Sequence, residues 1–291
     1  MTIPYGLIGL GNMGVPIAEN LTKNDISLII YDINDPTDRA PKKAKIAKTA
    51  ADVWREAETV FLCLPKGDNC KTVLQSLIET NDRVTTTVLE LSTIGMPMAK
   101  EIDDMLRPIN VNYFDSPMSG GVAGAKAATL TLMCAGSNEL LEDHRAALEA
   151  ISGNIFYLGV EPGKGQAMKL INNFMAATGL AVTSEAMNYG MHVGLDLKTM
   201  LDVVNVSTGA NVASQDKFPK RVLTKTYDAN FHTALLSKDV GLFHEGMKAA
   251  SLKGEIAPMM DALWKAANAA MPGSDMTEIY KFMKKRLGMK T

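Results

Sequence analysis

A glycine-rich segment near the amino terminus has the spacing of a phosphate-binding loop. Its six residues are Gly9, Leu10, Gly11, Asn12, Met13 and Gly14. The apolar run 5–10 leads into it, and a helical pattern over 14–23 follows it. Glycines at this spacing permit a tight turn, a close approach of the backbone to a pyrophosphate, and close packing of the helix on the strand. Because the helix start also presents free N–H groups, the segment predicts a dinucleotide site.

An acidic residue lies where a dinucleotide-binding unit contacts the adenosine ribose. Asp32 comes 18 residues after Gly14, at the end of the apolar run 27–31. A carboxylate at this place accepts hydrogen bonds from the ribose hydroxyls and repels a 2′-phosphate. The nearest arginine along the chain is Arg39, so no cation is expected beside Asp32. We therefore predict that NAD is preferred over NADP.

Composition and charge exclude several classes of protein. The 291 residues carry 30 Lys+Arg against 32 Asp+Glu, a net charge of −2, and 46% of them are hydrophobic. A disordered chain would be less apolar, and a nucleic-acid-binding protein would carry a basic surface. The apolar stretches are much shorter than the roughly 18 residues that a membrane span needs. The first residues show neither the basic region nor the cleavage site of a signal peptide. We predict no nucleic-acid partner and no membrane partner.

The cysteines and histidines predict neither disulfides nor a metal site. Cys63, Cys70 and Cys134 are odd in number and have no CxxC spacing, which is typical of buried thiols in a reducing compartment. The four histidines are scattered without the pairwise spacing of zinc ligands. We therefore expect a cytoplasmic protein without a bound metal.

The elements that must position these residues alternate along the first half of the chain. Seven apolar runs are predicted strands: 5–10, 27–31, 59–64, 87–91, 111–114, 130–135 and 155–158. Segments of helical length lie between them, and nearly continuous apolar strands are typical of a parallel sheet covered on both faces.

The pattern changes after about residue 162. Apolar residues there recur near a 3.6-residue period, so 165–193 predicts one helix of roughly 40 Å. Further helices are predicted over 196–206, 233–250, 257–270 and 275–287. We predict an α/β Rossmann-type domain over 1–162, followed by an all-α domain over 163–291 and joined to it by the long interdomain helix.

Several motifs together resemble those of the β-hydroxyacid dehydrogenases, a family that includes 3-hydroxyisobutyrate dehydrogenase and tartronate semialdehyde reductase. The glycine loop resembles the opening of the family, and 115–121 (DSPMSGG) resembles its substrate-binding signature. Residues 163–173 (GKGQAMKLINN) resemble the catalytic segment. Residues 231–239 resemble the motif near the carboxyl terminus that contacts the cofactor, and 91–93 (LST) matches a nicotinamide-side motif.

The resemblance implies an NAD(P)-dependent interconversion of a small β-hydroxy acid and its semialdehyde. It assigns Lys169 as the catalytic acid/base and Asn173 as its substrate-holding companion. It places the substrate carboxylate at Ser119, Gly120 and Gly121, and Lys238 near both nicotinamide and substrate. Further cofactor contacts are implied for Leu64, Pro65, Ser92, Thr93 and Phe231.

These residue types suit hydride transfer. Reduction of a carbonyl leaves negative charge on its oxygen, which needs a proton or a positive charge nearby. A lysine ammonium is a compact proton donor, and Lys169 and Asn173 are four residues apart on one predicted helical face. Two consecutive glycines after Ser119 free the backbone N–H groups to hold a carboxylate.

Other interpretations remain open at this point. Lys169 alone is also compatible with a solvated surface charge, and Lys238 and Asp239 with a surface ion pair. Glu90 stands where the family usually has Asp. An imine reductase of the same architecture and a non-catalytic NAD-binding regulator are the alternative functions. The long apolar helix, with many Met and Ala residues, indicates a homodimer or homotetramer.

Overall fold

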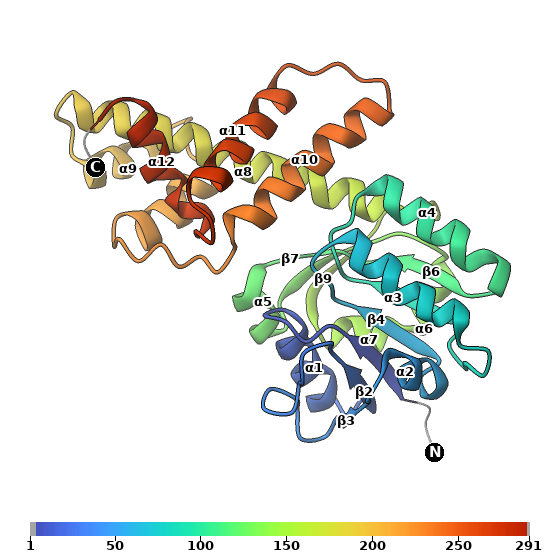
Figure 1. Cartoon of the computed structure of the whole chain (residues 1–291). Helices are drawn as coiled ribbons and strands as arrows, with labels where there is room; N and C mark the ends of the chain where they lie inside the picture. Colours follow the sequence, from blue (N-terminus) through green and yellow to red (C-terminus); the bar gives the residue numbers. More distant parts are fainter. Residues whose placement is uncertain (1–3, 290–291) are drawn as a thin grey trace. The chain divides into compact units, whose positions relative to one another are not determined.

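The chain divides into two compact units, Met1–Lys169 and Leu170–Thr291. The computed structural model describes residues 4–289 (Figure 1). The long helix α8 (Lys164–His192) begins in the first unit and continues through the second. Each unit has its own hydrophobic core and is described by itself.

The first unit is built on a six-stranded sheet in which every pair of neighbouring strands is parallel. The strands are β1 (Tyr5–Ile8), β2 (Leu28–Tyr31), β3 (Lys45–Ile46), β4 (Thr59–Leu62), β5 (Thr87–Glu90) and β6 (Asn112–Asp115). Their order across the sheet is β3-β2-β1-β4-β5-β6. The strand order reverses between β1 and β4, which is where dinucleotides bind in sheets of this kind. The predicted Rossmann-type domain is confirmed.

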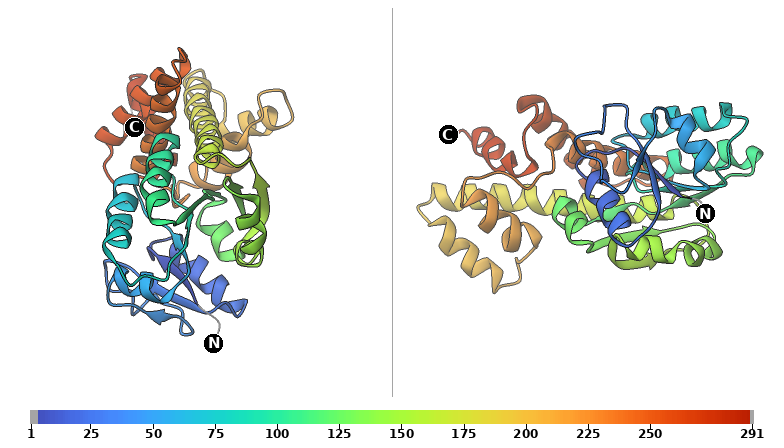
Figure 2. Two further views of the ribbon diagram at one scale, coloured as in Figure 1. Left: turned by 90° about the vertical axis from the view of Figure 1, so that its right-hand side faces the viewer. Right: turned by 90° about the horizontal axis from the view of Figure 1, so that it is seen from below.

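The sheet is apolar on both sides because helices cover both faces. The helices that follow its strands are α1 (Gly14–Lys23), α2 (Ala50–Glu56), α3 (Gly67–Glu79) and α4 (Met96–Leu106). Leu7 and Phe61 belong to one buried cluster together with Ile17 of α1. Ile8 and Leu62, the next residues along the same strands, belong to the cluster formed with α2, α3 and α4. Figures 1 and 2 show the helices of the first unit around this sheet. This alternation explains the uninterrupted apolar runs of the sequence.

A second, smaller sheet completes the first unit. It consists of β7 (Met118–Ser119), β8 (Leu130–Cys134) and β9 (Ser152–Tyr157), with β7 antiparallel and β9 parallel to β8. The short helices of this region are α5 (Gly121–Ala127), α6 (Asn138–Asp143), α7 (Arg145–Glu149) and the 3-10 turn η1 (Arg107–Ile109). The predicted strands 130–135 and 155–158 thus form a sheet of their own. The helical stretch 139–151 is two helices because His144 leaves helical geometry, with φ −107° and ψ 9°.

The second unit is helical throughout the part that the structure describes. Besides α8 it contains α9 (Leu197–Asn205), α10 (Thr233–Ala249), α11 (Ile256–Ala270), α12 (Ile279–Arg286), the π-helical segment η2 (Ala213–Val222) and the 3-10 turn η3 (Met276–Glu278). Its core includes Phe218 and Trp264, both fully buried. α8 is 29 residues long and ends before Gly194, whose φ is +91°, as predicted. Across residues 4–289, no helix has the length and apolar character of a membrane span.

Candidate active site

The glycine loop connects β1 to α1 at the carboxyl edge of the first sheet. A Cβ on Gly9 would lie 2.3 Å from the Cys63 carbonyl oxygen, and one on Gly14 would lie 1.9 Å from the Gly9 carbonyl oxygen. Internal packing therefore explains these two glycines. A Cβ on Gly11 would meet no atom within 4 Å. Packing does not require glycine there, whereas a pyrophosphate lying on the loop would, so the loop fits a dinucleotide.

Asp32 is held directly against this loop. Its Oδ2 accepts a hydrogen bond from the Leu10 N–H at 2.6 Å, and its Oδ1 accepts one from the Asn34 N–H at 2.8 Å. The expectation that no cation lies beside Asp32 is wrong, because Arg39 Nη2 is 3.0 Å from Asp32 Oδ1. The chain turns back after Pro36, whose carbonyl oxygen accepts the Arg39 N–H, and this turn returns the guanidinium to the end of β2.

The predicted nicotinamide-side residues are grouped at the same edge of the sheet. Register pairs Leu62 at the end of β4 with Glu90 at the end of β5, so the segments that follow these strands are neighbours. Ser92 Oγ accepts the Leu64 N–H at 2.7 Å, which joins the two segments directly. Pro65 and Thr93 are the next residues along each segment.

The predicted carboxylate-binding turn is accessible and depends on its glycines. Ser119 ends β7, and Gly120 and Gly121 lead into α5 with φ of +126° and +62°. Both glycines are exposed, and a Cβ on Gly121 would meet open space. The turn therefore leaves room for a small ligand beside its backbone.

Lys169 is not a solvated surface lysine. It is only 9% exposed on α8, and a lysine is rarely buried to this extent unless its charge has a partner. Asn173, one helical turn later, is also buried, and its Nδ2 donates to Asp239 Oδ2 at 2.6 Å.

Lys238 and Asp239 are not a surface ion pair either. Asp239 is 2% exposed, and its Oδ1 lies 3.2 Å from Lys238 Nζ. One buried carboxylate thus holds both Asn173 and Lys238 in the second unit. Asp239 is not among the site residues predicted from the sequence. Phe231 is not a member of this hydrogen-bonded group, and its carbonyl oxygen accepts the Met276 N–H.

Two further carboxyl groups are buried beneath the nicotinamide-side segments. Glu90 and Asp115 are register partners on β5 and β6, and both are fully buried. Burial raises the pKa of Glu90 to about 7, although the Ser92 N–H and hydroxyl oppose this shift. Burial also raises the pKa of Asp115 to about 6, against hydrogen bonds from Tyr113 and the Gly163 N–H.

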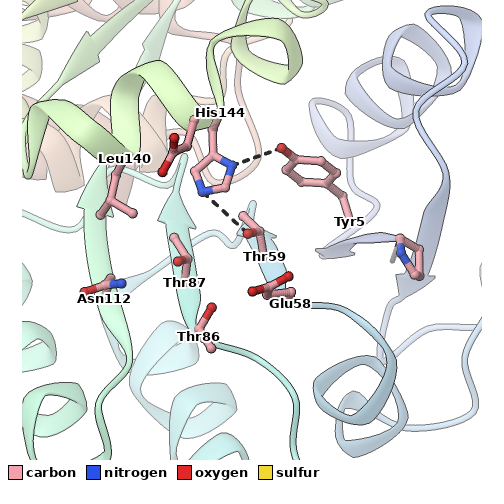
Figure 3. Close-up of a pocket in the computed structure, with 10 residues that line it drawn as sticks. Tyr5, Glu58, Thr59, Thr86, Thr87, Asn112, Leu140 and His144 are labelled. Carbon is pink, nitrogen blue, oxygen red and sulfur yellow. Dashed lines mark hydrogen bonds between the residues drawn. The ribbon is translucent and has the colours of Figure 1, made fainter. Parts of the chain in front are cut away.

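A cavity of about 350 Å³ lies at the opposite, amino-terminal edge of the sheet (Figure 3). Its lining includes Glu58 and Asp143, and no lysine or arginine is among the described residues that line it. His144 accepts or donates hydrogen bonds there, with Nδ1 2.9 Å from the Tyr5 hydroxyl and Nε2 3.5 Å from Thr59 Oγ1. Burial lowers the pKa of His144, which favours the neutral ring, although Asp143 and Glu58 oppose this shift. The cavity therefore suits neither a phosphate nor a carboxylate. Residues 4–289 also contain no cluster of three or more His, Cys, Asp or Glu that could hold a metal ion.

Comparison with known proteins identifies the family. A model described as the NAD binding domain of 6-phosphogluconate dehydrogenase matches residues 4–159. A model described as NAD-binding of NADP-dependent 3-hydroxyisobutyrate dehydrogenase matches residues 163–283. The mitochondrial 3-hydroxyisobutyrate dehydrogenase of Mus musculus is 32% identical over 267 residues, which are 87% of this chain and 79% of the relative. The chain belongs to the β-hydroxyacid dehydrogenase family.

Other relatives agree with this assignment. The 2-(hydroxymethyl)glutarate dehydrogenase of Eubacterium barkeri is 26% identical over 99% of this chain and 97% of its own. The structure of Mycobacterium tuberculosis 3-hydroxyisobutyrate dehydrogenase with L-serine superimposes with a TM-score of 0.89 at 27% identity, covering 98% of this chain and 100% of that one. The Streptomyces aurantiacus imine reductase is more distant, with a TM-score of 0.62 at 19% identity, and shares the fold alone. The predicted enzyme class, an NAD(P)-dependent β-hydroxyacid oxidoreductase, is confirmed.

The buried carboxyl of Glu90 makes the stability of this dehydrogenase depend on pH. An unfolded Glu ionises near pH 4.5, whereas the folded protein keeps this proton up to about pH 7. The free energy of unfolding should therefore fall as pH rises through this window, by up to about 3 kcal/mol from Glu90, and level off above it.

Glu90→Gln removes the titrating group and keeps an oxygen that accepts the Ser92 N–H. Urea unfolding at pH 5 and pH 8 should show a smaller loss of stability for this variant than for the wild type. Glu79→Gln, at an exposed position of α3, should behave like the wild type. Equal pH slopes for Glu90→Gln and the wild type would contradict the assignment.

Proposed function

We propose that the protein interconverts a small 3-hydroxyisobutyrate-like β-hydroxy acid and its semialdehyde, with Lys169 as the acid/base. The hydride comes from, or goes to, the bound nicotinamide cofactor. The burial of Lys169 on α8, one turn before the fixed amide of Asn173, is the observation that carries this proposal. The names of relatives, 3-hydroxyisobutyrate dehydrogenase and 2-(hydroxymethyl)glutarate dehydrogenase, support this substrate class.

Each polar group of the site then has one task. Lys169 Nζ gives a proton to the carbonyl oxygen in the reduction and takes it back in the oxidation. Asn173 holds the substrate, and its orientation is set by the hydrogen bond to Asp239. Asp239 also pairs with Lys238, which would add positive charge near the anionic substrate. The turn Ser119–Gly121 would receive the substrate carboxylate with a hydroxyl and backbone N–H groups.

The two parts of the chain divide the work in this proposal. Residues 1–162 bind the cofactor through the glycine loop, Leu64, Pro65, Ser92 and Thr93. Residues 163–291 supply Lys169, Asn173, Lys238, a cofactor contact at Phe231, and the contact between subunits. The three cysteines are free thiols. This supports our inference of a reducing, cytoplasmic location, although several relatives are named as mitochondrial.

We further propose that NAD is preferred over NADP. Asp32 lies at the end of β2 against the glycine loop, where a carboxylate accepts hydrogen bonds from the adenosine ribose. Its carboxylate also pairs with Arg39, which partly neutralises this cation. NADP is the second candidate, because a solved structure named Psf3 in complex with NADP+ and 2-OPP, 25% identical with a TM-score of 0.81, shares the fold. Arg39 is the residue that would contact a 2′-phosphate.

Removing the Lys169 ammonium should lower turnover strongly without affecting cofactor binding. For Lys169→Ala we expect kcat to fall by roughly 10²–10⁴-fold, the usual contribution of a positioned acid/base. The Kd for NADH, measured by fluorescence titration, should stay within about threefold of the wild type. Lys198→Ala, at an exposed lysine of α9, is the matched control and should keep full activity. Near-normal turnover by Lys169→Ala would show that another group moves the proton.

Cofactor preference should depend on the pair Asp32 and Arg39. The wild type should have a kcat/KM for NADH at least tenfold above that for NADPH. Asp32→Ala should lower NADH use and raise NADPH use, because Arg39 loses its partner. Arg39→Ala should lower the remaining NADPH use and leave NADH use within about threefold. A tenfold preference of the wild type for NADPH would overturn the proposal.

An exposed apolar stripe on α8 supports a homodimer or homotetramer. Its members follow one another at steps of four and seven residues, the spacing of one helical face. They are Ile171, Met175, Val182 and Tyr189, which are 41%, 68%, 59% and 67% exposed. An uncovered stripe of this kind is typical of a subunit contact.

Charge in the middle of this stripe should separate the subunits. For Val182→Glu we expect size-exclusion chromatography with light scattering to show a smaller particle than the wild type. Lys198→Glu, an exposed charge change on α9, should leave the mass unchanged. A monomeric wild type, or an unchanged oligomer in Val182→Glu, would exclude this face as the contact.

A further inference from the structure

The first turn of α8 contains a buried amide to which the catalytic assignments give no role. Gln166 is fully buried and lies three residues before Lys169. Its Oε1 accepts the N–H groups of Ile94, at 2.9 Å, and Gly95, at 3.3 Å. Its Nε2 donates to the Ser92 carbonyl oxygen at 3.1 Å. Nε2 also lies 3.5 Å from an oxygen of Asp115. Both donors and both acceptor positions of the amide are therefore in use.

One partner of Gln166, Ser92, is proposed to contact nicotinamide, and two others, Ile94 and Gly95, belong to the same segment. The segment Ser92–Gly95 follows β5, and Ser92 also fixes the segment after β4 through the Leu64 N–H. One side chain thus joins both nicotinamide-side segments to the helix that carries Lys169. All of these contacts lie within the first unit.

The backbone around Gln166 is built for this close approach. A Cβ on Gly163 would lie 2.7 Å from Met96 Cγ, and one on Gly165 would lie 2.3 Å from the Met133 carbonyl oxygen. Glycine at both positions lets α8 begin in contact with the segment after β5 and with β8. These contacts explain the glycines and the glutamine of the segment 163–166 (GKGQ). The catalytic role of Lys169 alone would not require these three residues.

Asp115 contacts the Nε2 end of the Gln166 amide and also binds the backbone just before α8. Its Oδ2 accepts the Gly163 N–H at 2.5 Å, and its Oδ1 accepts the Tyr113 hydroxyl at 2.8 Å. Asp115 ends β6, so the sheet holds this carboxylate in place. The start of α8 is therefore connected to the ends of two strands, β5 through Ser92 and β6 through Asp115.

We propose that Gln166 is a positioning residue of the reaction, which fixes the place of Lys169 relative to the Ser92–Gly95 segment. This inference rests on the proposed role of Lys169. Proton and hydride must reach the same carbonyl group, and a misplacement of about 1 Å can cost about 10²-fold in rate. A rigid connection between the helix and the cofactor-contacting segment keeps this distance constant.

Gln166→Met keeps the length of the side chain and removes all four hydrogen bonds. We expect kcat to fall by about 30- to 100-fold, while the Kd for NADH stays within about threefold. Hydrogen exchange followed by mass spectrometry should show at least tenfold faster exchange of the Ile94 and Gly95 amides. Gln75→Met, at an exposed glutamine of α3, is the matched control and should change neither quantity.

Gln166→Glu gives a signature that a merely structural role would not produce. The new carboxyl can accept from Ile94 and Gly95 in either state, but it can donate to Ser92 and Asp115 only when protonated. The titratable groups around it are Asp115, Tyr113 and Glu90 from the sheet and Lys169 on its own helix. The new carboxylate would repel those of Asp115 and Glu90, so these groups titrate together with it, and the ratio of variant to wild-type kcat reports the change that the new carboxyl introduces. This ratio should rise at least fivefold as pH falls from 8 to 6, whereas the ratio for Gln166→Met should stay constant.

The outcomes separate this inference from the proposed function. Wild-type kcat with Gln166→Met, unchanged exchange of the Ile94 and Gly95 amides, or a pH-independent ratio for Gln166→Glu would each overturn it. If Gln166→Met does not fold, the pH ratio of Gln166→Glu decides alone. If the wild type turns over no β-hydroxy acid or semialdehyde, the proposed function fails. Amide exchange in the two Gln166 variants then still tests the connection, and unchanged exchange rejects it.

Discussion

The start of α8 lies so close to both sheets of the first unit that a Cβ on Gly165 would be 2.3 Å from the Met133 carbonyl oxygen of β8 and 3.0 Å from Asp115 Cβ at the end of β6. Backbone polar groups brought this close are shielded from water, and each must find a partner inside the protein. Gln166 supplies those partners for the segment after β5, and Asp115, at the end of β6, supplies one for the Gly163 N–H just before the helix. These hydrogen bonds fix the first turn of α8. Because Lys169 lies in the next turn of the same helix, its position is fixed as well.

In the second unit, a charged group is buried and also needs partners inside the protein. Asp239 is buried, and a buried carboxylate is costly unless cations and donors surround it. Lys238 and the Asn173 amide meet this need, so the structural requirement and the proposed chemistry use the same groups. Removing Lys238, Asn173 or Asp239 would leave a partner with an uncompensated charge or an unsatisfied hydrogen-bonding group.

The sequence predicts the repetitive parts of this molecule well. Continuous apolar strands, the glycine spacing of residues 9–14 and the 3.6-residue period of α8 are local signals, and the corresponding elements are present. β3 is two exposed residues, Lys45 and Ile46, and carries no such signal. Arg39 reaches Asp32 because the chain turns at Pro36. The number of residues between Asp32 and Arg39 does not predict this turn. Gln166 looks like any polar residue of a helix, since its partners are more than 50 positions away.

In the proposed reaction, Lys169 gives and takes the proton of a β-hydroxyacid dehydrogenase. The most direct test is NADH oxidation with a panel of C3–C4 semialdehydes by the wild type and by Lys169→Arg. The arginine keeps the positive charge but does not release its proton near neutral pH. Our account predicts turnover of at least one carboxylate-bearing semialdehyde by the wild type and its loss in Lys169→Arg. Equal turnover by both proteins, or a wild type that binds NADH and reduces no member of the panel, would contradict it.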